Sequence, residues 1–135
     1  MKKLLIVIDM QNDFITGTLG SLQAQQILPS VKAKITKYKQ NGDTILFTRD
    51  THCENYLETQ EGRYLPVPHC IQGTEGHLIE KGLDADSCEV FDKPTFGSLD
   101  LAKKVAEGNF DEIELCGLCT EGTWRKQDIS ICHSL

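Results

Sequence analysis

The architecture of this protein can be read from Leu4-Leu5-Ile6-Val7-Ile8, an aliphatic run that leads directly into Asp9-Met10-Gln11-Asn12-Asp13-Phe14. Five apolar residues without polar alternation are typical of a strand covered on both faces, as in the centre of a parallel α/β sheet. Ligands of such sheets bind beyond the carboxyl ends of the strands. We therefore expect Asp9 to lie at a functional site. The alternative is that Asp9 only turns the chain out of the sheet, since Asp favours turns.

Strand and helix patterns alternate along the rest of the chain. Further strands are expected at 44–48, 88–91 and 112–116, and helices from Pro29 to about residue 40, at 74–81 and at 99–107. Residues 14–26 are expected to form a loop, and 49–73 a long ordered loop rich in functional side chains. This alternation predicts one three-layer α/β/α domain over residues 1–135, with a parallel, Rossmann-like sheet.

Composition narrows the choice of partner and compartment. The net charge of -6 and the pI near 5.1 argue against nucleic acid or an anionic membrane as the main partner, so a small molecule is expected. The apolar start ends at Asp9 without a signal-peptide cleavage site, and no stretch approaches transmembrane length, which favours a cytoplasmic location. In that compartment the six scattered cysteines are expected to be reduced.

Polar side chains follow the predicted strands: Asp9 after the first, Asp50 and His52 after the second, and Lys93 after the third. The carboxyl ends of parallel strands lie on one edge of a sheet, so these residues are expected to converge. Lys93 is either an ordinary solvated charge or a cation that lowers the pKa of a nearby thiol, whose proton a carboxylate such as Asp9 would accept.

A metal site is one interpretation of the long loop. Asp50 and His52 stand two residues apart, which places them on the same face of an extended chain. With His69 they form a candidate Asp/His/His site for a divalent metal such as Zn²⁺. The alternative is that these loop residues bond only one another or the backbone. No organic cofactor is expected.

A second interpretation concerns Cys116-Gly117-Leu118-Cys119, which has the spacing of a thiol redox motif. Redox chemistry requires an exposed pair at a helix N-terminus. Cys116, however, closes an apolar strand and is expected to point into the core.

Five stretches together resemble the isochorismatase-like cysteine hydrolases, a family that includes nicotinamidases. These are Ile6 to Phe14 (IVIDMQNDF), Thr48 to His52 (TRDTH), Pro66 to Gly76 (PVPHCIQGTEG), Asp92 to Ser98 (DKPTFGS) and Glu112 to Thr120 (EIELCGLCT). They occur in the expected order and cover nearly the whole chain up to Thr120.

The resemblance implies a hydrolase for a small amide such as nicotinamide. Asp9 would take the thiol proton, and Lys93 would steady the thiolate and polarise the substrate. A cysteine would then attack the amide carbonyl to form a thioester that water hydrolyses. In the nicotinamidase branch, Asp50, His52 and His69 would match the metal ligands that anchor the pyridine nitrogen.

The sequence departs from the family pattern where the nucleophile is expected. The family reads Gly-x-x-Thr-Asp-x-Cys, whereas this chain has Thr120, Glu121, Gly122 and Thr123 at the aligned positions. Thr123 therefore occupies the nucleophile position, and a hydroxyl is a much weaker acid than a thiol. The nearest thiol, Cys119, comes four residues early.

Residues 121–135 are atypical, with no helical stripe and without the family's final strand and helices. We hypothesise a shifted reading frame, an altered terminus or a truncation after Thr120, which the other two frames of the coding DNA would test. An exposed sheet edge there would favour a homo-oligomer.

Three functions remain open from the sequence: an amide hydrolase, active or inactivated at Thr123; a non-catalytic binder of a small molecule or metal; and a redox protein using Cys116 and Cys119.

Overall fold

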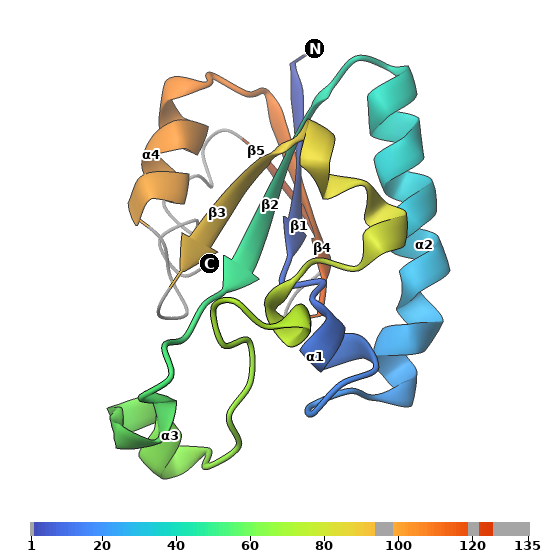
Figure 1. Ribbon diagram of the computed structural model, residues 1–135. Helices are drawn as coiled ribbons and strands as arrows, with labels where there is room; N and C mark the ends of the chain where they lie inside the picture. Colours follow the sequence, from blue (N-terminus) through green and yellow to red (C-terminus); the bar gives the residue numbers. More distant parts are fainter. Residues whose placement is uncertain (1, 94–98, 119–121, 126–135) are drawn as a thin grey trace.

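The aliphatic run near the start of the chain forms the central strand of the sheet. In the computed structural model, which describes residues 2–93, 99–118 and 122–125, β1 (Lys3–Ile8) pairs in parallel with β2 (Thr44–Asp50) and β4 (Glu112–Gly117). β3 (Glu89–Lys93) pairs in parallel with β2, so the order is β3-β2-β1-β4-β5 (Figure 1). The predicted parallel sheet of four strands is confirmed.

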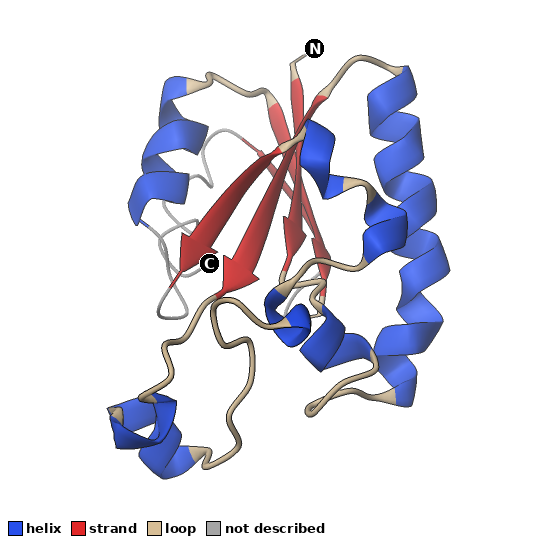
Figure 2. Cartoon of the chain, viewed as in Figure 1, coloured by secondary structure: helices blue, strands red, loops and turns tan. Residues whose placement is uncertain are grey.

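Helices cover both faces of this sheet (Figure 2). Because side chains alternate along a strand, β1 supplies both cores. Leu5 and Val7 pack with α2 (Leu22–Gln40) on one face, and Leu4, Ile6 and Ile8 pack with α4 (Leu99–Glu107) on the other. The predicted three-layer α/β architecture is therefore confirmed.

The first long helix begins earlier than predicted. α2 starts at Leu22, and Ser21 is its N-cap, accepting a hydrogen bond from the Ala24 amide. Pro29 lies inside the helix rather than in its first turn. A proline there removes one backbone donor and its ring crowds the carbonyl four residues back, and the buried side chains of Ala24 and Val31 in the flanking turns offset this cost. The loop prediction for 14–26 was wrong over 22–26, and also over 14–15, which belong to α1 (Asn12–Ile15).

The predicted helix at 74–81 is also wrong, because 3₁₀ turns η2 (Glu75–His77) and η3 (Lys81–Leu83) flank an extended stretch. That stretch pairs with the chain after β1: the Asn12 amide donates to the Leu78 carbonyl, and the Glu80 amide donates to the Met10 carbonyl. Long-range backbone pairing has overridden local helix preference here.

The predicted long loop carries two short elements, η1 (Tyr56–Glu58) and α3 (Gln60–Tyr64), which extend beyond the end of β2 (Figure 1). After β4 the chain adds β5 (Gly122–Arg125), an antiparallel strand that the sequence did not predict. The rest of the atypical tail, residues 121 and 126–135, lies outside the described residues. In the described part of the chain, no helix is both long and apolar enough to cross a membrane.

Candidate functional site

Asp9 leaves the sheet at the end of β1 in a left-handed conformation, with φ of 51°. Aspartate tolerates this conformation better than most residues. The residue is 3% exposed, and its Oδ1 accepts a hydrogen bond of 2.8 Å from the Thr48 hydroxyl. On the other side Gly117, with φ of 127°, lies so close to the Ile8 backbone that a Cβ would clash. The carboxylate is thus held at the edge where β1, β2 and β4 end.

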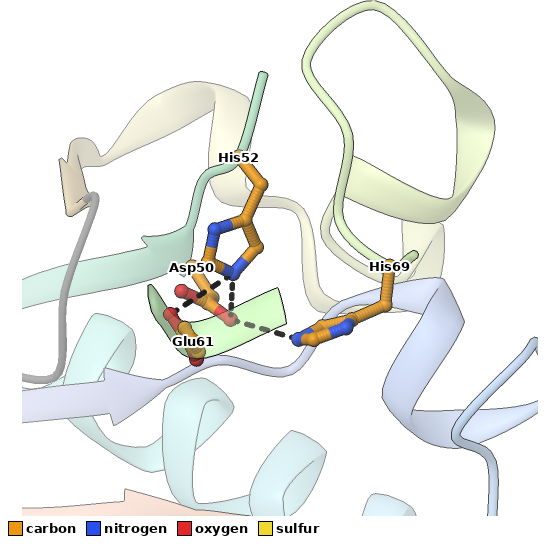
Figure 3. A group of neighbouring side chains, drawn as sticks. All are labelled: Asp50, His52, Glu61 and His69. Carbon is orange, nitrogen blue, oxygen red and sulfur yellow. Dashed lines mark hydrogen bonds and ion pairs between the residues drawn. The ribbon is translucent and has the colours of Figure 1, made fainter. Parts of the chain in front are cut away.

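Four potential metal ligands converge beyond the end of β2 (Figure 3). Asp50 closes β2, His52 follows it, Glu61 lies in α3, and His69 lies on the returning chain. One donor atom from each lies within 4.8 Å of all the others. Asp50 Oδ2 is 3.0 Å from His52 Nε2 and 3.4 Å from His69 Nε2, and Glu61 Oε2 is 3.8 Å from His52 Nε2.

The orientation of His69 suits ligation through Nε2. Its Nδ1 lies 2.7 Å from the Val67 carbonyl, which can only accept, so Nδ1 carries a proton and Nε2 faces Asp50. Burial lowers the pKa of His69, but the hydrogen bonds with Asp50 and Val67 outweigh it, so the pKa is raised overall. A backbone carbonyl that accepts from the second ring nitrogen is a usual outer partner of a metal-binding histidine.

Aromatic rings enclose the cluster. Tyr56 is 1% exposed, and its ring centroid lies 4.7 Å from that of His52 and 5.1 Å from that of His69. Phe14 adds a further contact with His69 at 5.5 Å. Burial, followed by the charges of Glu61 and Asp50, raises the pKa of the Tyr56 phenol. Two imidazoles and two carboxylates brought this close together suit Zn²⁺ or a similar divalent ion.

The structure brings Asp50, His52 and His69 together, as a metal site requires, and adds Glu61, which the sequence analysis did not single out as a ligand. In the sequence, Glu61 does not stand at the short, regular spacing of a metal-binding motif from the other candidate ligands. Only the fold of the loop brings α3, and with it Glu61, close to His52.

The predicted catalytic residues are placed only in part. Lys93 pairs in register with Asp50, so its backbone reaches the same edge of the sheet, but its side chain lies outside the described residues, as does Cys119. Thr123 lies in β5 opposite Glu114, three residues before the end of β4, which is about 10 Å back from the edge. Thr123 is therefore not placed beside Asp9.

The thiols give no support to a redox site. Cys116 is 1% exposed and packs in the core beneath α2, so its sulfur lacks the exposure that exchange requires. Of the other cysteines in the described part of the chain, Cys53 is exposed, Cys88 is partly buried and Cys70 is buried.

Comparison with known proteins identifies relatives along almost the whole chain. A family model described as the isochorismatase domain matches residues 3–126. The protein PncA of Bacillus subtilis, described as an uncharacterized isochorismatase family protein, is 32% identical, with 90% of this chain and 73% of that protein covered. The nicotinamidase of Acinetobacter baylyi is 26% identical, with 87% of this chain and 68% of that protein covered.

A solved structure shares the fold. The pyrazinamidase of Pyrococcus horikoshii in complex with zinc superposes with a TM-score of 0.74 at 33% identity, covering 89% of this chain and 72% of that one.

Proposed function

Because this chain belongs to the isochorismatase family of hydrolases, we propose that its site binds a small aromatic amide of the nicotinamide and pyrazinamide class through a divalent metal ion. The observation that carries this proposal is the convergence of Asp50, His52, Glu61 and His69 beyond the end of β2. Relatives described as a nicotinamidase and as a pyrazinamidase in complex with zinc support it.

The four side chains would hold the ion, which would offer a Lewis-acidic position to a heteroaromatic ring nitrogen. Aromatic walls from Phe14 and Tyr56 surround the two imidazoles, an environment that suits a flat ring. The substrate's amide group would then extend toward Asp9.

For hydrolysis we propose that Asp9 accepts a thiol proton and that Lys93 stabilises the thiolate. The thiolate adds to the amide carbonyl, ammonia leaves with the proton returned from Asp9, and water cleaves the thioester to the acid. Cys119 is the candidate thiol, since it follows β4 and the position of the family nucleophile is held by Thr123.

A second candidate function is binding without turnover. The pairing of Thr123 with Glu114 favours it, because this places the residue at the nucleophile position away from the carboxyl edge. In that case the pocket and the metal would be retained without the reacting thiol.

Ammonia release from nicotinamide and pyrazinamide separates the two functions. Zinc-loaded protein that releases ammonia, with the activity lost in Asp9→Ala and Cys119→Ser but kept in Asp43→Ala, supports the hydrolase. Zinc-dependent binding of nicotinamide without ammonia release supports the binder. If the chain shows neither zinc-dependent binding of nicotinamide nor ammonia release, the proposed site is contradicted.

A further inference from the structure

The side chain of Gln11 lies just beyond the point where the pairing between β1 and β2 ends. The register between the two strands ends at the pair Ile8 and Thr48, and Asp9 then turns away with φ of 51°. β2 nevertheless continues to Asp50. The register of β2 with β1 therefore stops two residues before Asp50, which still pairs with Lys93 of β3.

At Asp50 the side-chain amide of Gln11 lies beside β2 and bonds to its backbone. Its Oε1 accepts a hydrogen bond of 2.8 Å from the Asp50 amide, and its Nε2 donates to the Asp50 carbonyl at 2.8 Å. A side-chain amide thus makes the two hydrogen bonds that a backbone neighbour would make. Nε2 also donates to the His77 carbonyl at 2.8 Å, which holds the last residue of η2 at the same point.

This arrangement specifies glutamine. The residue is 0% exposed, and both of its amide hydrogens and its oxygen are used inside the protein. Glutamate has the same shape but lacks both donors, so two buried carbonyls would face a carboxylate. Methionine would fill the volume and leave all three backbone groups without these partners.

Further hydrogen bonds hold the backbone next to two other candidate ligands, His52 and His69. The backbone of His52 pairs with Cys70 and Gln72, at 3.0 and 2.8 Å. Cys70 in turn donates its amide to the Asp13 carboxylate at 2.8 Å, directly after His69. Gln11 and Asp13 therefore hold the backbone at the two segments that supply three of the four candidate ligands.

We propose that Gln11 is a positioning residue for the metal site, which sets metal affinity by fixing the backbone of Asp50 and so the direction of its carboxylate. This inference rests on the proposed metal site and adds a residue that influences metal affinity without contacting the ion. Loss of outer partners of metal ligands typically weakens metal binding by about 10–100-fold.

The test measures the Zn²⁺ dissociation constant of the full chain by competition with a chromophoric chelator, well below the melting temperature. Gln11→Met and Gln11→Glu are compared with Ile113→Ala, a matched destabilising change in the core beneath α4. We expect both Gln11 variants to bind zinc at least about 10-fold more weakly, and Ile113→Ala to bind it within about twofold of wild type despite a lowered melting temperature.

Amide hydrogen exchange of the wild-type chain tests the inference even if the Gln11 variants do not fold. The Asp50 amide should exchange as slowly as the Phe47 amide inside β2. Fast exchange at Asp50, or wild-type zinc affinity in Gln11→Met, would overturn the inference while leaving the metal site intact. No zinc binding by the wild-type chain would instead overturn the metal site, and with it the effect on affinity.

Discussion

The Thr48 hydroxyl donates a hydrogen bond of 2.8 Å to Asp9 Oδ1, joining the ends of two neighbouring strands beneath the candidate site. Thr48 is 0% exposed, so no solvent replaces this donor if it is removed. One threonine therefore orients the carboxylate for which we propose the role of base.

Thr48→Val keeps the shape of the side chain and removes the donor to a buried carboxylate. The expected cost is about 1–3 kcal/mol in the free energy of unfolding, measured by urea denaturation. Thr44→Val, at the other end of the same strand, should change stability by less. Equal effects of the two substitutions would show that the Thr48 hydrogen bond does not stabilise the fold.

Zinc is expected to stabilise the folded chain, because the four ligand atoms converge only after folding. At free zinc 100 times the dissociation constant, the free energy of unfolding should rise by about 2.7 kcal/mol, seen as a higher melting temperature that a chelator reverses. His69→Ala should lose most of this gain, and magnesium should give little. A zinc response that survives in His69→Ala would exclude this cluster as the binding site.

Glu61 is expected to be a weaker contributor than the histidines, since its Oε2 lies 3.8 Å from His52 Nε2 and its side chain is partly exposed. Glu61→Gln should weaken zinc binding measurably in a chelator competition. Glu58→Gln, a matched change on the neighbouring turn η1, should leave zinc affinity unchanged. If the two variants bind zinc equally well, the site has three protein ligands rather than four.

A separate prediction concerns pH and the carboxylate of Glu114 beneath α2. Partial burial raises its pKa, but Lys34 Nζ at 2.7 Å and the Tyr38 hydroxyl at 2.7 Å outweigh that effect and hold the pKa below the usual 4.5. A depressed folded pKa means that this stabilisation is present above pH 4.5 and is lost as the pH falls through the folded pKa.

Wild type should therefore lose free energy of unfolding on acidification below pH 4.5 more steeply than Glu114→Gln, in urea titrations repeated at each pH. Glu107→Gln, at the exposed end of α4, serves as the control and should follow wild type. Parallel curves for wild type and Glu114→Gln would refute the role of the Lys34 and Tyr38 contacts.

The sheet, its parallel direction and the helices on both faces follow from local patterns in the chain. The unbroken apolar run from Leu4 to Ile8 has few alternatives to a strand covered on both sides, and residues 99–107 present one apolar face. Boundaries that depend on a single capping residue were less predictable, as the start of α2 at Ser21 shows.

Local patterns also indicated that Asp9, Asp50, His52 and Lys93 belong to one edge, because parallel strands end together, and that His69 could join Asp50 and His52 at a metal site. They did not indicate Glu61 or Gln11, whose roles arise from a returning loop and from a hydrogen bond across 39 residues of chain. Nor did they indicate that residues 122–125 pair antiparallel with β4. Each of these depends on contacts between segments that are distant in the sequence, and only the tertiary structure decides which of those segments meet.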